Sequence, residues 1–191
     1  NVIADGQAQI ILAKTAAGAA PNGVNVNAGQ TCNLVIGGTG NQIGSMSTVL
    51  VSGGGTLNIS GNSVTVGTLS VANTPADSLP SKINSSVLIG LNQGISAYVN
   101  TQANPAINAN LTLNGFLPIT VSGGPQFLVI NGNIGGNGFQ KLGTGVLRLN
   151  GNNTFFGDMQ ISAGTVQPLT ANSFGQPTPP YGVELAGGIL Q

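Results

Sequence analysis

The chain has 191 residues, of which 40% are hydrophobic, four are Lys or Arg and four are Asp or Glu, so its formal net charge is zero. The hydrophobic content excludes a solvated disordered chain, and the 4% charged fraction lies far below the roughly 25% of a typical soluble domain. Nucleic-acid binding, which requires a cationic cluster, is excluded because the basic residues are scattered at Lys14, Lys82, Lys141 and Arg148.

The first candidate strand lies at residues 7–15, where Ile10 and Ile11 form part of a short apolar run. We expect this segment to be suited to donation to a second copy of the chain. Cys32 follows as the only cysteine, and His is absent, which removes the usual zinc ligands, the commonest general base and any intrachain disulfide. We expect Cys32 to pack as a small apolar residue, the alternative being an intermolecular disulfide or a reactive thiol.

Short apolar alternations, each followed by Gly, Asn or Ser, then recur along most of the chain. This period of two predicts strands with one buried face. Two architectures fit: a sandwich or barrel of hairpins, or a solenoid in which each strand stacks on its counterpart one coil later. The repeated Asn-Gly pairs suit both architectures. The shortness of the strands and the abundance of Asn, which can form amide ladders when stacked in register, favour the solenoid. The candidate strands are residues 49–51, 56–60, 64–66, 68–71, 111–114, 119–122, 127–130 and 146–149.

The segment from Asp77 to Thr101 departs from this pattern, because its apolar residues recur every three or four positions. This spacing predicts a helix, which Asp77 or Ser78 would cap, although Gly90 and Gly94 disfavour it. We expect a short helical or irregular insertion, residues 77–101, that covers apolar core, the alternative being a contact element for polymerisation. The apolar residues concerned are Leu79, Ile83, Val87, Leu91, Ile95 and Tyr98.

Residues 138–175 contain an ordered series of anchors, ending in Ser173-Phe174-Gly175. This segment resembles the autotransporter-associated β-strand repeat, also called the passenger-associated transport repeat, with Phe155-Phe156 in place of the usual Tyr-Thr and Val166 in place of Leu. The resemblance implies about two coils of a parallel, right-handed β-helix from a secreted or surface protein of Gram-negative bacteria. The anchors are Lys141-Leu142-Gly143-Thr144-Gly145, Leu147-Arg148-Leu149-Asn150-Gly151, Asn153-Thr154-Phe155 and Ala163-Gly164-Thr165-Val166.

The same anchors have a physical meaning of their own. Glycines allow sharp turns, leucines two positions apart point to the same side of a strand, and an Asn-Thr pair can hydrogen-bond a corner. We therefore expect turns at Gly143 and Gly145, a corner at Asn153, and Phe155 in the core. At roughly 20 residues per coil and about 4.8 Å between stacked strands, the whole chain would form a rod on the order of 40 Å long.

Catalysis is not expected from this sequence. Glycoside hydrolysis needs two carboxyl groups about 5–10 Å apart, and no two acidic residues share a short motif. We expect Asp158 to form a surface ion pair with Lys141 or Arg148 across neighbouring coils. We predict no catalytic, cofactor-binding or metal-binding residues. The complete acidic inventory is Asp5, Asp77, Asp158 and Glu184.

The sequence therefore predicts an all-β, parallel β-helix that occupies residues 1–191 as one domain. Its predicted function is that of a non-enzymatic extracellular structural protein, the subunit of a surface filament that self-associates end to end or by strand exchange. The alternative is a passenger or adhesin segment that acts as a spacer or adhesion rod against a host or matrix surface. Membrane insertion is not expected, because no run of 18 apolar residues occurs. The start at Asn1 and the end within a strand-like stretch favour a processed precursor or a fragment.

Overall fold

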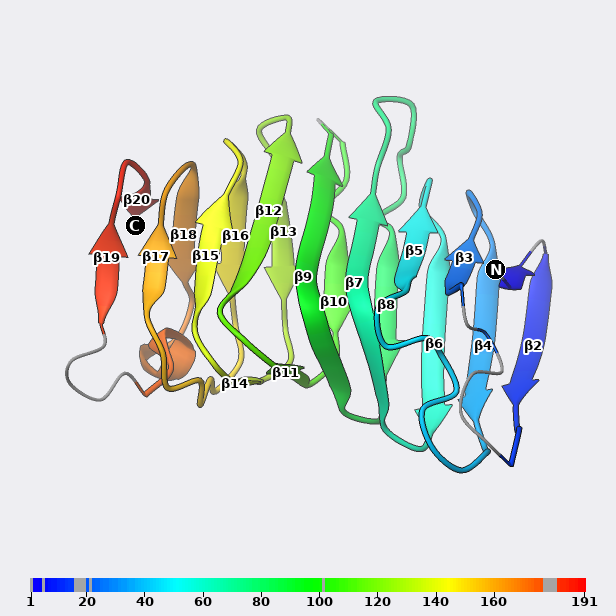
Figure 1. Cartoon of the computed structure of the whole chain (residues 1–191). Coiled ribbons are helices and arrows are strands. Elements are labelled where there is room, and N and C mark those ends of the chain that lie inside the picture. Colours follow the sequence, from blue (N-terminus) through cyan, green and yellow to red (C-terminus); the bar gives the residue numbers. More distant parts are fainter. Residues whose placement is uncertain (1, 5, 16–19, 21, 101, 177–181) are drawn as a thin grey trace.

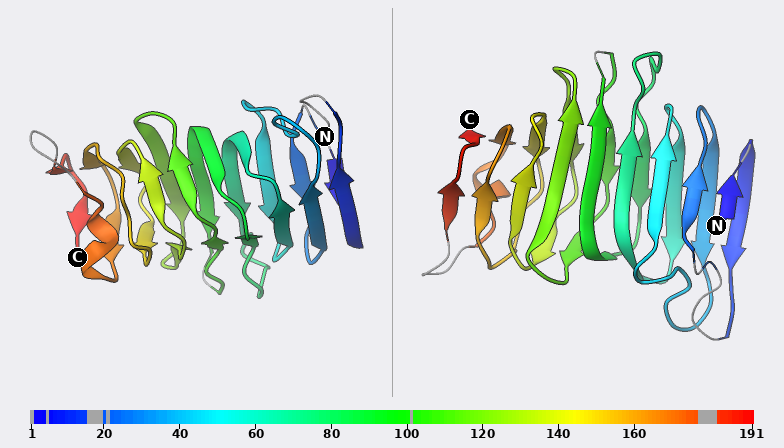
Figure 2. Two further views of the ribbon diagram at one scale, coloured as in Figure 1. Left: turned by 90° about the horizontal axis from the view of Figure 1, so that it is seen from below. Right: turned by 45° about the horizontal axis from the view of Figure 1, so that its top comes forward.

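The computed structural model describes residues 2–4, 6–15, 20, 22–100, 102–176 and 182–191. Within these residues the chain is a parallel β-solenoid, in which each strand pairs with a strand one coil later. Figures 1 and 2 show two facing sheets in an elongated rod, with the N- and C-termini at opposite ends. The predicted β-helix is confirmed, and the sandwich of hairpins is excluded because every pairing between the named strands is parallel.

Strands alternate between the two sheets along the chain, except that β11 and β12, and likewise β14 and β15, are consecutive strands of sheet A. Sheet A runs in the order β1 (Val2–Ala4), β3 (Val24–Val26), β5 (Thr48–Ser52), β7 (Val64–Ala72), β9 (Ile89–Val99), β12 (Leu117–Gly123), β15 (Phe139–Leu142), β17 (Met159–Ile161) and β19 (Val183–Leu185), with β11 (Leu111–Leu113) and β14 (Ile134–Gly136) beside this path. Sheet B runs in the order β2 (Gln7–Leu12), β4 (Thr31–Ile36), β6 (Thr56–Gly61), β8 (Lys82–Ser85), β10 (Ala106–Asn108), β13 (Phe127–Ile130), β16 (Val146–Leu149), β18 (Thr165–Pro168) and β20 (Ile189–Leu190). A short 3-10 helix covers Ala171–Phe174.

The core lies between the two sheets and consists of side chains stacked in register. Because successive strands are parallel and aligned, one inward position repeats from coil to coil and forms a continuous apolar row. These rows are almost entirely aliphatic and removed from water, which is the main term that holds the coils together. One such row in sheet A comprises Val24, Val49, Leu69, Ile95, Ile119, Lys141 and Ile161.

The predicted helix in residues 77–101 is wrong, because β8 and β9 occupy most of this segment. The spacing misleads because four positions are two periods of a strand, so the buried Leu91 and Ile95 share one face of β9 just as they would share one face of a helix. A β-bulge lies between them: Leu91 pairs with Val66 and Gly94 pairs with Thr68, so β9 has two residues opposite one in β7. The irregular part of the expected insertion is a loop between β7 and β8, which extends beyond the strands in Figure 1. Thr101 lies outside the described residues.

The candidate donor strand in residues 7–15 is engaged within its own chain. Its residues Gln7–Leu12 form β2, the first strand of sheet B, and pair in parallel with β4. A donated strand would therefore have to leave this pairing first.

Candidate functional site on the outer face of sheet B

The repeat-like segment places its apolar anchors as predicted. Leu147, Leu149 and Phe155 are fully buried, and the ring of Phe155 packs edge-on against Phe139 with 5.4 Å between centroids. Asn153 holds the corner: its Oδ1 accepts the backbone N–H of Ile134 at 2.8 Å, and its Nδ2 donates to the carbonyl of Ser173 at 2.7 Å. These contacts tie one coil to both of its neighbours.

Lys141 is buried in the core, which the sequence analysis did not predict. Its side chain is 0% exposed, and its Nζ donates to the backbone carbonyls of Leu142 and Gly143 at 2.8 Å and of Ala163 at 3.2 Å. Burial lowers the pKa of this ammonium to about 8, because desolvation penalises the charged form. The period of two could have predicted this burial, since Lys141 lies two positions after the inward-facing Phe139.

The predicted ion pair of Asp158 with Lys141 or Arg148 is not formed among the described residues. Asp158 instead accepts the backbone N–H of Gly182 at 2.9 Å. The Arg148 guanidinium lies over the ring of Phe127, 3.6 Å from its centroid, and its Nε donates to Oε1 of Gln167 at 2.7 Å. A cation–π contact and a neutral amide thus fix this side chain in place of a carboxylate.

Cys32 packs in the core as predicted. The side chain is fully buried in β4, and burial raises the pKa of the thiol above its ordinary value of 9.0. A raised pKa disfavours the thiolate, which is the reactive form.

Six asparagines on the outer face of sheet B form a continuous ladder, the asparagine ladder. The first four members are paired in register on consecutive strands, and the last two follow directly after the ends of β13 and β16. Each member after the first donates its Nδ2 to Oδ1 of the preceding member. The donor–acceptor distances are 2.8, 2.8, 2.7, 2.7 and 3.2 Å. This confirms the amide ladders that the abundance of Asn suggested. The members are Asn33, Asn58, Asn84, Asn108, Asn131 and Asn150.

A second line of asparagines follows the corner next to the ladder. The backbone N–H of Asn133 donates to Oδ1 of Asn110, and that of Asn152 donates to Oδ1 of Asn133, both at 2.9 Å. Asn172 continues the line by donating to Oδ1 of Asn152 at 3.3 Å. Each of these side chains bonds its equivalent on the next coil, so the corner repeats as regularly as the strand.

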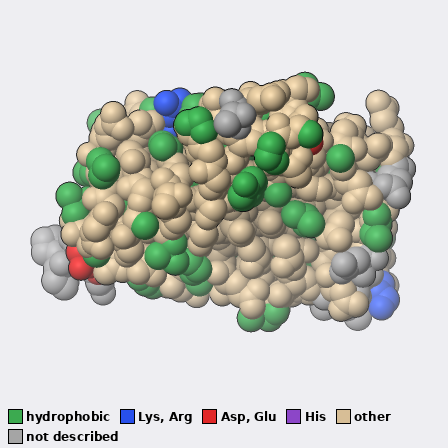
Figure 3. All heavy atoms as spheres, turned by 90° about the horizontal axis from the view of Figure 1, so that it is seen from above, with side chains coloured by type: hydrophobic (Ala, Val, Ile, Leu, Met, Phe, Trp, Pro, Cys, Tyr) green, Lys and Arg blue, Asp and Glu red, His purple; other side chains and the backbone are tan. Residues whose placement is uncertain are grey.

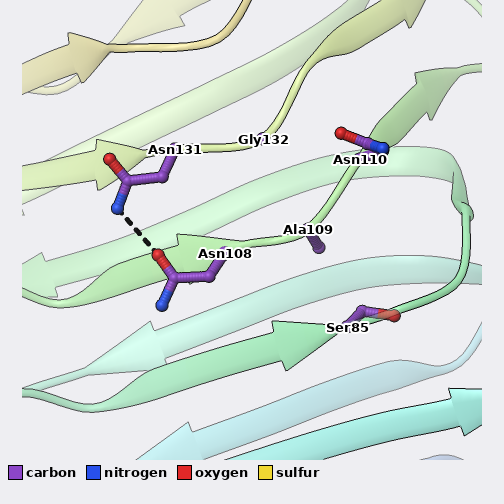
Figure 4. Close-up of a pocket in the computed structure, with 6 residues that line it drawn as sticks. All are labelled: Ser85, Asn108, Ala109, Asn110, Asn131 and Gly132. Atoms are coloured by element: carbon purple, nitrogen blue, oxygen red, sulfur yellow. Dashed lines mark hydrogen bonds between the residues drawn. The ribbon is translucent and has the colours of Figure 1, made fainter.

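A shallow hollow of about 270 Å³ lies between these two lines. Figure 4 shows the amides of Asn108 and Asn131 joined by their ladder bond, with Asn110 farther along the chain and Ser85 on the preceding coil. Ala109 and Gly132 complete the lining, so the hollow presents amide and hydroxyl groups and no charge.

A second hollow, of about 310 Å³, lies at the start of β7 and β9. Gly90 is part of its lining, and a Cβ there would lie 2.9 Å from Oγ1 of Thr65 and 3.3 Å from Nδ2 of Asn114, so a larger residue would force these neighbours to shift. Neither hollow was predicted, since a depression between coils depends on the size of side chains on neighbouring rungs.

Charged side chains are sparse on the surface. Figure 3 shows them at only a few isolated places on one face of the rod, with uncharged surface between them. The described residues contain no group of three or more His, Cys, Asp or Glu placed to share a metal ion. No helix in the described ranges is long and apolar enough to span a bilayer. Asp5 lies outside the described residues.

Comparison with known proteins identifies the repeat. Residues 139–167 match the family model of the passenger-associated-transport-repeat, within the 138–175 segment predicted from its anchors. No match was found among curated proteins or among solved structures. The chain therefore carries one recognised passenger-associated transport repeat, built into a longer β-solenoid.

Proposed function

We propose that this chain is a non-enzymatic, rod-forming segment of a secreted or surface-exposed bacterial protein, a passenger-type β-helix that acts as a spacer or adhesion rod. The observation that carries this proposal is the continuity between the recognised repeat and the rest of the solenoid. The strands of residues 139–167 pair in register with β12 and β13 on one side and with β19 and β20 on the other. One structural plan thus extends from the repeat through the described chain.

Surface display tests this function. The chain is fused to the membrane barrel of an autotransporter in a Gram-negative host, and accessibility to an antibody and an added protease is measured on intact cells. We expect the wild-type segment to be displayed as a folded, protease-resistant rod. A matched fusion with Phe155→Asp, which places a charge at a fully buried position of the repeat, should show less surface-exposed protein. Retention of both fusions inside the cell would contradict the proposal.

A second candidate function is that of a filament subunit that stacks end to end. Val183 and Leu185 occupy inward positions in register with Met159 and Ile161, yet they are 37% and 58% exposed because no described coil covers them. A second copy, or further coils of a longer chain, would bury these side chains and pair the free edges of β19 and β20. With a formal net charge of zero, little repulsion opposes such stacking.

Sedimentation and negative-stain microscopy of the 191-residue chain over a wide concentration range test the filament. We expect end-to-end polymers that Leu185→Asp abolishes. The control Tyr98→Asp changes a side chain that is 48% exposed on β9, in the middle of sheet A and far from both end coils, so it should leave assembly intact. Strictly monomeric rods at every concentration would rule out the filament and leave the display experiment to decide the first proposal.

A further inference from the structure

We propose that the outer face of sheet B binds an acidic polysaccharide, with a sugar ring in the hollow at Asn108, Asn110 and Asn131 and a sugar carboxylate on Arg148. This inference goes beyond the rod function and does not depend on it, because it concerns the isolated chain.

The hollow has the chemistry of a site for a hydroxyl-rich ring. Its volume of about 270 Å³ lies just below the usual range of small-molecule pockets, and its lining combines amides with the small residues Ala109 and Gly132. Asn110 uses Oδ1 to accept the N–H of Asn133, while its Nδ2 has no partner among the described residues. The ladder bond between Asn131 and Asn108 holds two further amides in fixed orientations, so a ligand meets pre-organised donors and acceptors.

Arg148 supplies an immobilised cation on the same outward face as the hollow. Its guanidinium lies over Phe127 at the start of β13, whereas Asn131 borders the hollow just past the end of that strand, about 13 Å away at about 3.3 Å per residue. Phe127 and Gln167 fix the guanidinium through its face and its Nε, so the contacts of the described residues leave its terminal nitrogens available. A planar guanidinium held in this way is arranged for bidentate hydrogen bonding to a carboxylate.

The proposed binding face offers a second cation in addition to Arg148. Lys82 lies in the same outward row as Arg148, with Ala106 and Val129 between them, so the two cations are about 14 Å apart along the rod at about 4.8 Å per coil. The asparagine ladder borders this row along its whole length. The described acidic residues lie elsewhere, in a loop, at a corner and in sheet A. Separated cations beside a line of amides fit a long ligand with repeating hydroxyls and spaced carboxylates.

Calorimetric titration with an oligogalacturonate and with its fully methyl-esterified form tests the proposal, because the two probes share a backbone and differ in charge. We expect the acid form to bind more tightly than the ester, and Arg148→Gln to weaken its binding about tenfold. Lys82→Gln should weaken it less. Lys14→Gln removes the same charge after the end of β2, in the first coil of the rod and three coils before Lys82, and should change nothing.

Asn110→Asp provides a second variant that keeps the fold. The carboxylate retains the oxygen that accepts the N–H of Asn133, so the corner bond survives while a negative charge enters the hollow. We expect this variant to lose binding of the acid form. Asn25→Asp, which adds the same charge on the outward side of β3 in sheet A, should bind as the wild type does.

Three outcomes would overturn the inference, provided that the variants melt within a few degrees of the wild type. The first is that the oligogalacturonate does not bind. The second is that it binds equally to the wild type and to Arg148→Gln. The third is that a polyglutamate peptide binds as tightly as the oligogalacturonate with the same dependence on Arg148, which would mean that the face recognises acidic peptides.

Discussion

Lys141 is a charged side chain in an otherwise aliphatic row of the core. It occupies a position that Ile119 and Ile161 fill on the neighbouring coils, yet its ammonium stays within the solenoid by donating to three backbone carbonyls. The stem packs like an aliphatic residue while the head satisfies a turn, which is how long cationic side chains commonly divide their roles. The turn at Gly143 thus has a hydrogen-bond donor from inside the core.

The lowered pKa of Lys141 predicts a pH dependence of stability. The folded state releases its proton near pH 8 and the unfolded state near pH 10.5, so between these values the unfolded chain binds more protons and the free energy of unfolding rises with pH. We expect a gain of about 2 kcal/mol between pH 7 and pH 10 that is absent in Lys141→Met. Denaturant unfolding of both proteins at the two pH values measures it.

The difference in pH dependence between the wild type and Lys141→Met separates the effect of Lys141 from that of the Cys32 thiol. Burial raises the pKa of Cys32, so ionisation of the unfolded thiol lowers stability above about pH 9, a trend of opposite sign that both proteins share. An identical pH profile for the wild type and Lys141→Met would show that the ammonium is not desolvated.

At the scale of the element, the asparagine ladder links the strands of sheet B on their outer side. Asn84 is an interior member that both donates and accepts, whereas Asn150 is an end member that only donates. The ladder therefore adds side-chain hydrogen bonds between coils to those of the backbone. The contribution of each asparagine to the free energy of unfolding should therefore depend on whether it makes two ladder bonds or one.

We expect Asn84→Ala to lower the free energy of unfolding by about 1–2 kcal/mol, since it removes two side-chain hydrogen bonds. Asn150→Ala removes one and should cost about half as much. Urea denaturation of the two variants gives the comparison. Equal losses, or none, would indicate that water replaces the ladder bonds without cost.

Much of the fold could be predicted from the sequence because its signals are local. Period-two alternation, glycine turns and abundant Asn all follow from one strand and its next turn, and they correctly favoured the solenoid. The β9 bulge could not be predicted, because it depends on which residue of β7 lies opposite Gly94. The hollow and the contact of Arg148 with Phe127 likewise depend on which residues lie beside one another on neighbouring coils, and no short stretch of sequence gives that information.

At the scale of the whole molecule, the strands of each coil pair only with strands of the coils before and after it. One hydrogen bond, from Nδ2 of Asn92 to the carbonyl of Ser45, reaches past an intervening coil. The longest strands, β7 and β9, lie in the middle of sheet A, whereas the outermost β1 and β19 have three residues each. Stability in such an array is a sum of coil and interface terms, so a coil with one neighbour opens more easily than a coil with two.

Hydrogen exchange measured strand by strand should show this gradient. We expect the amides of β7, β9 and β12 to exchange most slowly, and those of β1, β19 and β20 to exchange fastest. Uniform protection along the rod would indicate that the described coils unfold as one cooperative unit.

The asparagine ladder also makes the rod a vector. All five of its hydrogen bonds have the same sense, with the later residue donating toward the earlier one, so the amide dipoles add along the axis and do not cancel. The Asn33 end presents N–H groups, and the Asn150 end presents a carbonyl oxygen. Neither end of the ladder is an end of the rod, because Gln9 of β2 lies opposite Asn33 and the strands β18 and β20 continue sheet B beyond Asn150. The ladder therefore gives the outer face of sheet B a fixed polarity along the rod axis, with a plus end at Asn33 and a minus end at Asn150.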